Sequence, residues 1–273
     1  MTRYRPRTAL LEGLMILAGL AFMVPVYLLV NLSIRSPQDQ SSPFAPTTQP
    51  TLTNYVVAWE EGGLALAFLI SVVVTVVSTG LVVVTSALAA YPLARHTSRL
   101  STWAYFFFLF GLLLPFQLAM VPLYATMRDL GLLGNPISLM LYYWGSQLPF
   151  AIFMYAGFLR VIPLDYEEAA AIDGAGLLAT FWGVVFPLLR PVTGTIAILT
   201  VIAIWNDYLI PMLYLSGSRL TTLPVAITSF VGQYSAQWNV VFAGLVLSVS
   251  PVLIAYFIMQ RTIIHGFAGG LKG

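Results

Sequence analysis

Long apolar runs dominate this chain. Four stretches, residues 13–34, 62–94, 100–127 and 130–159, contain no Asp, Glu, Lys or Arg. Each is longer than the roughly 20 residues that a helix needs to cross the hydrocarbon core of a membrane. Backbone groups in lipid must pair within the chain, so runs of this length are expected to be helices. The pattern predicts an all-α polytopic membrane protein. Its six expected spans are residues 10–33, 64–91, 102–124, 138–160, 188–215 and 240–263.

The first apolar run could be mistaken for a signal peptide, because Arg3, Arg5 and Arg7 precede it. The apolar region of a signal peptide is about 7–15 residues long and ends at a small-x-small cleavage site. This run continues from Leu10 to about Asn31, and no such site follows it promptly. We interpret it as a retained first span.

The basic residues predict the orientation of the spans. If both termini are inside, nine of the twelve basic residues lie inside and three lie outside. Cytoplasmic loops of membrane proteins carry an excess of Lys and Arg, so we predict this orientation. The inside set is Arg3, Arg5, Arg7, Arg95, Arg99, Arg160, Arg190, Arg261 and Lys272. The outside set is Arg35, Arg128 and Arg219.

Two segments are expected outside the membrane. Residues 34–63 contain a stretch rich in Ser, Pro and Thr at 36–50, a composition that cannot bury a core and predicts a loop. Residues 216–238 contain Q-Y-S-A-Q-W-N and are a candidate contact for an external partner.

A polar segment at residues 163–191 interrupts the apolar pattern on the predicted cytoplasmic side. Four of the ten acidic residues lie in it: Asp165, Glu167, Glu168 and Asp173. Pro163 disfavours helix at the residue before it and is expected to help end the fourth span. A new helix is then predicted, with Asp165 as its N-cap and Glu168 closing a capping box.

The rest of this segment suits a short exposed helix. Ala169, Ala170 and Ala171 are strongly helical and small, so a partner could approach the backbone closely. Gly174 and Gly176 are expected to permit a sharp turn out of the helix. On helix chemistry alone two interpretations remain open: a capped, solvated surface helix, or a docking element for a partner at the membrane surface.

The spacing of this segment is more specific than its helix chemistry. Glu168, Ala169 and Ala170 are followed by Gly174 and, after nine further residues, by V-x-F-P ending at Pro187. This resembles the E-A-A-x3-G-x9-I-x-L-P loop in the permease subunits of ATP-binding-cassette importers, with Val for Ile and Phe for Leu. The resemblance implies that the loop enters a cleft on an ATPase and that Glu168 pairs with a basic residue there. The coupling residues that it implies are Glu167, Glu168, Ala169, Ala170, Asp173, Gly174 and Pro187.

The resemblance extends over nearly the whole chain. Y-P-L-A-R at 91–95, L-P-F-Q-L-A-M-V-P-L-Y at 114–124 and W-N-D-Y at 205–208 fit it, and Ile70-Ser71 departs from the Asn-Ser of many relatives. The tail G-F-A-G-G-L-K-G at 266–273 resembles that of sugar permeases similar to the smaller permease of the maltose transporter. In that relative the tail reaches between the ATPase subunits, which implies ATPase contacts for Gly269, Gly270 and Lys272.

The resemblance implies a type I importer fold and a place in the bacterial inner membrane. The expected organisation is a cytoplasmic N-terminus at 1–9, a six-span permease domain at 10–264 and a cytoplasmic tail at 265–273. Implied partners are a second, homologous permease, two ATPase subunits, an external sugar-binding protein and membrane lipid. The implied transport is alternating access, driven by ATP hydrolysis on the partner subunits.

Asp207 is the one acidic residue well inside a predicted span, and a carboxylate in that position is a functional hypothesis by default. With Trp205, Asn206 and Tyr208 it offers groups suited to sugar hydroxyls and ring faces. Alternatively, these polar residues hydrogen-bond neighbouring helices, as such residues often do in bundles. Gln117, between two prolines of the third span, is a further candidate for the substrate path.

Composition narrows the remaining alternatives. Hydrophobic residues make up 59% of the chain and charged residues 8%, against about 25% charged in soluble domains. Cysteine is absent and two histidines are too few for a metal site, so no metal or other cofactor is expected on this chain. Lys272 is the only lysine, so ATP and Mg must bind partner chains rather than a Walker A loop here.

No set of catalytic residues supports an enzyme, and a net charge of +2, spread over the loops, indicates no nucleic-acid partner. The alternatives are an ion-coupled secondary carrier or an importer permease for a solute other than a sugar.

Overall fold

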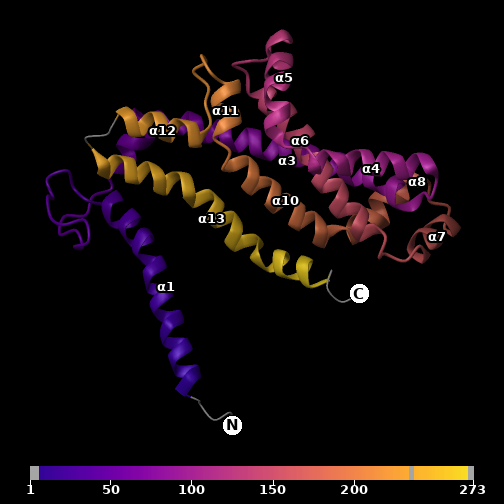
Figure 1. Cartoon of the computed structure of the whole chain (residues 1–273), viewed down its shortest axis with the longest axis horizontal. Coiled ribbons are helices and arrows are strands. Elements are labelled where there is room, and N and C mark those ends of the chain that lie inside the picture. The colour runs from indigo at the N-terminus through magenta and orange to yellow at the C-terminus, as the bar shows by residue number, and fades with distance from the viewer. Residues whose placement is uncertain (1–5, 234–236, 270–273) are drawn as a thin grey trace. The chain divides into compact units, whose positions relative to one another are not determined.

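The computed structural model describes residues 6–233 and 237–269, and their regular structure is helical apart from one isolated bridge between Arg35 and Pro50. Figure 1 shows the helices in chain order. The all-α prediction is therefore confirmed. The helices are α1 (Pro6–Ser33), α2 (Thr53–Val56), the π-helix η1 (Val57–Glu61), α3 (Leu64–Arg95), α4 (Arg99–Leu113), α5 (Phe116–Asp129), α6 (Pro136–Leu159), α7 (Asp165–Ile172), α8 (Leu177–Thr180), the π-helix η2 (Phe181–Val185), α9 (Phe186–Leu188), α10 (Arg190–Trp205), α11 (Leu209–Tyr214), α12 (Leu223–Gln233) and α13 (Trp238–Gly269).

Among the described residues, two helices are long and apolar enough to cross a membrane, Leu10–Ser33 and Leu64–Arg95. The number rises to four if each of two bent helix pairs is one span. The bends measure 99° between α4 and α5 and 75° between the Leu177–Leu188 segment and α10. The six-span count stays a prediction.

The third and fifth predicted spans, residues 102–124 and 188–215, are broken helices. The third breaks where Leu114 and Pro115 take extended backbone angles, because a proline disfavours helix at the residue before it. The fifth bends at Leu189 and is interrupted again between Trp205 and Leu209, at the W-N-D-Y motif.

The chain divides into two compact units. One comprises Met1–Ala65 and Ala226–Ser250, and the other comprises Leu66–Val225 and Pro251–Gly273. Each is described by itself below.

In the first unit, buried polar groups organise the Ser- and Pro-rich segment 36–50, which is irregular as predicted. The guanidinium of Arg35 donates hydrogen bonds to the carbonyls of Ser41, Ser42 and Ala45. Hydrogen bonds from Ser41 and Thr47 lower the pKa of Asp39 to about 2, which keeps it ionised 3.8 Å from Arg35.

A buried amide closes this segment at its C-terminal side. Asn54 donates two hydrogen bonds of 2.8 Å, to the carbonyls of Ser33 and Arg35. The side-chain oxygen of Asn54 accepts a hydrogen bond of 2.6 Å from the side-chain amide of Asn239 on α13. One side chain thus joins both ends of segment 34–53 to a helix far along the sequence.

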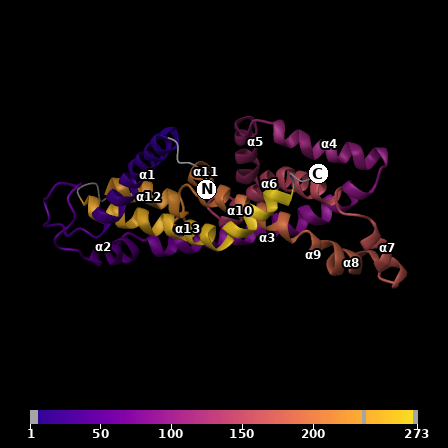
Figure 2. The ribbon, with the colours of Figure 1, turned by 90° about the horizontal axis from the view of Figure 1, so that it is seen from below.

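In the second unit, α6 is the central element. It packs against α4, α10 and α11, and its buried side chains Ala151, Ile152, Tyr155 and Leu159 lie in one hydrophobic core. That core also contains Phe181, Val185 and Leu189, so the return limb of the polar loop is part of it. Next to Ile70, where the sequence departs from the family pattern, the hydroxyl of Ser71 accepts a hydrogen bond of 2.7 Å from the Leu223 amide. α7 and α8 lie at one end of this unit in both ribbon views (Figures 1 and 2).

Candidate functional site

The acidic segment forms the helix α7 where the sequence predicts one, but its N-terminus differs from the prediction. The amides of Glu167 and Glu168 bond to the Leu164 carbonyl at 2.8 and 3.0 Å, and no side chain caps the helix. Leu164 already has helical backbone angles, so Asp165 lies inside the first turn rather than at the N-cap. The predicted capping box is therefore wrong. The three acidic residues of the first turn still suit the positive end of the helix dipole.

The C-terminus of α7 has the geometry of a Schellman motif. The Ala175 amide bonds to the Ala170 carbonyl at 2.9 Å, and the Gly174 amide bonds to the Ala171 carbonyl at 3.0 Å. Gly174 has φ of +81°, which a residue with a side chain rarely adopts. Gly176 has φ of −72°, so its backbone does not require glycine.

Glu167 faces into the protein. Its carboxylate accepts a hydrogen bond of 2.7 Å from the hydroxyl of Tyr91 on one oxygen. The other oxygen accepts 2.7 Å from Nε of Arg95 and lies 2.6 Å from Nη2 of the same guanidinium. The side chains of Arg95 and Glu167 are 11% and 13% exposed. Both carboxylate oxygens are therefore engaged within the chain.

Arg95 also reaches the end of α6. Its Nη1 donates hydrogen bonds of 2.8 Å to the Leu159 carbonyl and 3.1 Å to the Ile162 carbonyl. A cation is favourable here, because the last carbonyls of a helix carry partial negative charge and lack intrahelical partners. One guanidinium thus joins the ends of α3 and α6 to α7.

The return limb of the loop packs against the same residues. The ring of Phe181 lies 5.4 Å from that of Tyr91 and 5.0 Å from that of Trp182, centroid to centroid. η2 contacts α7, and Ala170 is buried. The side chain of Ala170 therefore packs inside the chain and does not lie on the exposed face of α7.

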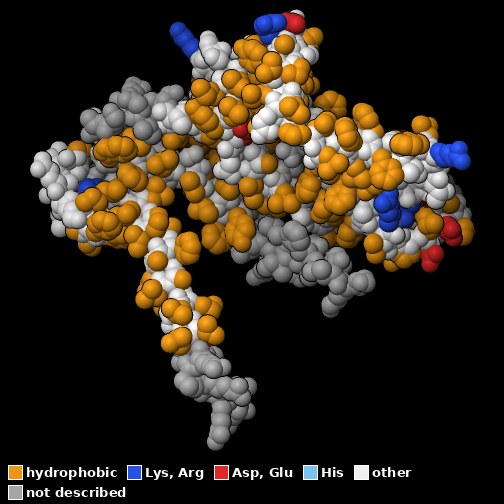
Figure 3. Space-filling view, in the orientation of Figure 1, with side chains coloured by type: hydrophobic (Ala, Val, Ile, Leu, Met, Phe, Trp, Pro, Cys, Tyr) orange, Lys and Arg blue, Asp and Glu red, His pale blue; other side chains and the backbone are white. Residues whose placement is uncertain are grey.

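The other face of α7 is free in this chain. Residues at spacings of three and four lie on one side of a helix. Asp165, Glu168, Ala169 and Ile172 have this spacing and are exposed, and Ile172 is 86% exposed. Asp173 beyond the helix is exposed too, and Pro187 in α9 is half-buried. Figure 3 shows acidic and basic side chains close together at the end that carries α7, with hydrophobic side chains over the helices beside them.

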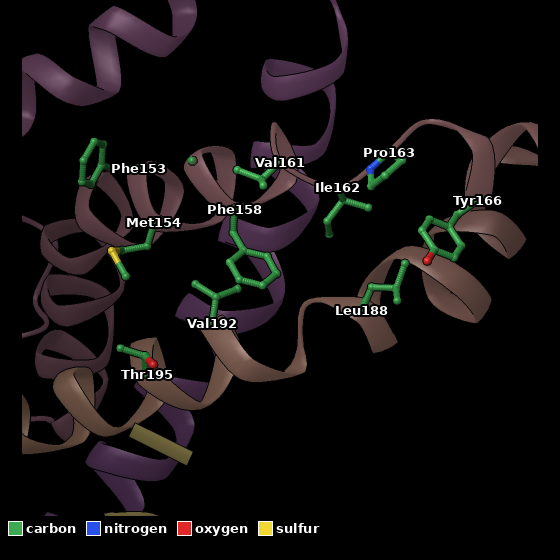
Figure 4. A pocket seen from close by; sticks show the side chains of 11 residues that line it. Phe153, Met154, Phe158, Val161, Ile162, Pro163, Tyr166, Leu188, Val192 and Thr195 are labelled. Carbon is green, nitrogen blue, oxygen red and sulfur yellow. The ribbon is translucent and has the colours of Figure 1, made fainter. Parts of the chain in front are cut away.

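A pocket of about 560 Å³ separates the beginning of the loop from its end (Figure 4). On one side its lining comes from α6 and the residues after it, such as Phe158, Ile162 and Tyr166. On the other side it comes from α9 and α10, with Leu188 and Val192. α3 contributes no residue to it.

The W-N-D-Y motif lies at the helix break between α10 and α11. Asp207 accepts a hydrogen bond of 3.0 Å from the Tyr143 hydroxyl on α6 and another of 3.0 Å from the Leu209 amide. Asn206 donates to the Ile202 carbonyl at 2.9 Å. The structure thus shows the contact with a neighbouring helix that the packing alternative requires, and it does not test a role in substrate binding.

The other candidates for the substrate path are scattered. Trp205 is buried, and its ring packs edge-on against Phe68 at 5.9 Å. Tyr208 is exposed, and Gln117 is exposed on α5. Gly269 is the last residue of α13, while Gly270 and Lys272 lie outside the described residues.

Two residues of the site, Tyr91 and Arg95, carry no predicted role. The sequence contained a signal for them, because they are four residues apart at the end of a span and therefore lie on one face of the helix. What the sequence could not reveal is which acidic residue they meet.

Comparisons of the sequence with a family model and with individual known proteins agree with one another. Residues 82–266 match the family model described as "Binding-protein-dependent transport system inner membrane component". The melibiose/raffinose/stachyose import permease protein MelC of Bacillus subtilis is 32% identical over 255 residues, covering 93% of this chain and 92% of that protein. The probable starch degradation products transport system permease protein AmyC of Thermoanaerobacterium thermosulfurigenes is 33% identical, covering 99% and 98%. The diacetylchitobiose uptake system permease protein NgcG of Streptomyces coelicolor is 33% identical, covering 96% and 88%.

A solved structure shares the fold. The crystal structure of a bacterial transporter of the ATP-binding-cassette type, involved in import of the acidic polysaccharide alginate, contains a chain that matches with a TM-score of 0.80. The match covers 95% of this chain and 99% of that chain at 24% identity.

Proposed function

This chain belongs to the family of binding-protein-dependent transport system inner membrane components, and we propose that it carries a sugar or oligosaccharide into the cell as one permease of an ATP-binding-cassette importer. It is a multi-pass membrane protein of the inner membrane. Its relatives named for melibiose, starch degradation products and diacetylchitobiose support a sugar as the solute.

The observation that carries the coupling mechanism is the exposed face of α7, formed by Asp165, Glu168, Ala169 and Ile172. On this face two carboxylates are followed by an alanine and an apolar side chain, and the opposite face of the short helix is fixed to the protein. Such a surface fits a cleft with a basic residue, since a charge-assisted hydrogen bond to Glu168 is about twice as strong as a neutral one. Beside this hydrogen bond, the side chain of Ile172 would bury apolar surface against the partner.

The partners follow from this assignment. Two ATPase subunits bind ATP and Mg, this chain pairs with a second permease, and an external binding protein delivers the solute. The loop 163–191 faces the cytoplasm, as the excess of basic residues on that side supports. When ATP closes the ATPase pair, α7 moves with it and the spans exchange inward and outward access. Each conformer then favours a different nucleotide state, and this coupling is reciprocal for binding free energies.

A charge reversal tests the proposal. In the reconstituted complex, Glu168→Lys is expected to abolish ATP-driven uptake while the chain still inserts and is recovered in the membrane. The matched control is Glu168→Gln, which keeps the size of the side chain and should retain part of the uptake. Wild-type uptake by Glu168→Lys would refute the role of Glu168. Uptake that survives ATP depletion but collapses with an uncoupler would instead indicate an ion-coupled carrier.

A further inference from the structure

We propose that Glu167 is a positioning residue that holds the coupling helix from inside the permease, and that Arg95 and Tyr91 hold it in turn. These three residues are here named the internal clamp. The inference rests on the proposed function, because it takes α7 to be the element that receives the motion of the ATPase. It gives the two adjacent glutamates of the E-E-A-A motif different roles.

Both oxygens of the Glu167 carboxylate are engaged within the chain. One oxygen accepts from Tyr91 and the other is contacted twice by Arg95, at distances between 2.6 and 2.7 Å. The pair is nearly buried, at 11% and 13% exposed. A carboxylate that is hydrogen-bonded on both oxygens and withdrawn from solvent offers little to an external partner. The neighbouring Glu168 is exposed, because successive residues of a helix point in directions about 100° apart.

The internal clamp connects α7 to the ends of two long helices. Arg95 is the last residue of α3, and it also holds the carbonyls of Leu159 and Ile162 where α6 ends. Tyr91 lies one turn earlier on α3, and its ring packs against Phe181 in the return limb of the loop. A displacement of α7 is therefore passed by direct polar contact to the cytoplasmic ends of α3 and α6.

The loop is held differently on its two sides. The clamp holds α7 against α3, whereas the pocket of about 560 Å³ lies between α6 and the α9–α10 limb and has no lining from α3. Polar contacts of defined geometry restrict motion more than an unfilled apolar space does. The loop is thus held by polar contacts at the clamp, whereas at the pocket Ile162 and Tyr166 face Leu188 and Val192 across unfilled space.

The experiment measures the restraint on α7 directly. The chain has no cysteine, so Ile172→Cys provides a single, exposed attachment point for a spin label on α7. The full-length chain with a cysteine-free permease partner is placed in lipid nanodiscs without the ATPase subunits, and label mobility is read by electron paramagnetic resonance. Glu167→Gln keeps the size of the side chain and removes its charge. The matched control is Glu168→Gln.

The expected result is a clear increase in label mobility for Glu167→Gln, a smaller increase for Tyr91→Phe, and none for Glu168→Gln. A spectrum for Glu167→Gln that equals the parent's would overturn the clamp, as would an equal change in Glu168→Gln. If Glu167→Gln does not assemble, Tyr91→Phe decides, because it removes one hydrogen bond and leaves the ion pair in place.

A second readout addresses transport. In the complete complex, loss of the clamp is expected to increase the ATP hydrolysed per solute moved several-fold while hydrolysis itself continues. A merely structural defect would lower both together and leave the ratio unchanged, and an unchanged ratio counts against the clamp. Failure of the proposed function would appear separately, as uptake independent of ATP in the parent, and the mobility measurement remains valid in that case because it needs no transport.

Discussion

Tyr143 on α6 donates a hydrogen bond of 3.0 Å to Asp207, at the break between α10 and α11. The other oxygen of the same carboxylate accepts 3.0 Å from the Leu209 amide, which begins α11. Asp207 therefore has structural partners both in a neighbouring helix and in its own segment. A carboxylate inside a membrane protein is costly unless such partners satisfy it.

From this arrangement we predict that Asp207→Ala destabilises the permease more than Asp207→Asn does. Alanine leaves the Tyr143 hydroxyl and the Leu209 amide without their acceptor, and a hydrogen bond to a charged group contributes about 1.5–3 kcal/mol. Asparagine retains an acceptor of the same size. Thermal unfolding in nanodiscs measures the difference, and uptake is measured separately on the same samples. Normal uptake by Asp207→Asn would show that the charge has no part in transport, whereas equal unfolding temperatures for the two variants would contradict the structural role.

The end of α7 gives a prediction with a matched control in the same loop. Gly174→Ala forces a side chain into the left-handed region, at a cost of roughly 1–2 kcal/mol. Gly176→Ala meets no such cost, because φ is −72° and no atom lies within 4 Å of the new Cβ. We expect Gly174→Ala to weaken stimulation of the ATPase by the permease and Gly176→Ala to leave it near wild type. The test is the rate of ATP hydrolysis by the reconstituted complexes. An equal loss in both variants would show that the left-handed backbone at Gly174 is not the cause.

The pocket beside the loop can be filled from Gly157 on α6. A Cβ at this position meets nothing within 4 Å, so Gly157→Ala should be tolerated and should favour the helix by up to about 1 kcal/mol. Gly157→Trp places a large ring in the space between α6 and the α9–α10 limb. We expect slower uptake with a normal amount of assembled complex. Transport by the tryptophan variant at the rate of the alanine variant would show that the pocket does not change volume during the cycle.

Asn54 should control the order of the segment at residues 36–50. Asn54→Ala leaves the carbonyls of Ser33 and Arg35 and the amide of Asn239 without their partner, and each buried unsatisfied group costs about 1–3 kcal/mol. The expected result is faster proteolytic cleavage between residues 36 and 50 in nanodiscs. Thr48→Ala, at an exposed position in the same segment, is the control and should cleave at the parent rate. Equal rates in all three proteins would contradict the role of Asn54.

What could be predicted from the sequence is local. Apolar runs longer than a membrane crossing predict helices, Pro163 marks the end of α6, and the left-handed backbone at Gly174 ends α7 close to the predicted position. The spacing of the E-A-A motif identifies the family without any knowledge of contacts. Each of these signals lies within one continuous stretch of the chain, so the sequence alone carries it.

The tertiary structure decided how the functional residues are used. Glu167 and Glu168 are the same residue type in the same helical turn, and only packing assigns the first to the interior and the second to solvent. The partner of Glu167, Arg95, lies 72 residues away, and Tyr143 lies 64 residues from Asp207. The hydrophobic pattern predicts that two segments are helices, but it does not predict which of their faces meet. That choice depends on how side chains from distant segments pack together, which here brings Tyr91 and Arg95 to the carboxylate of Glu167 and Phe181 to the ring of Tyr91.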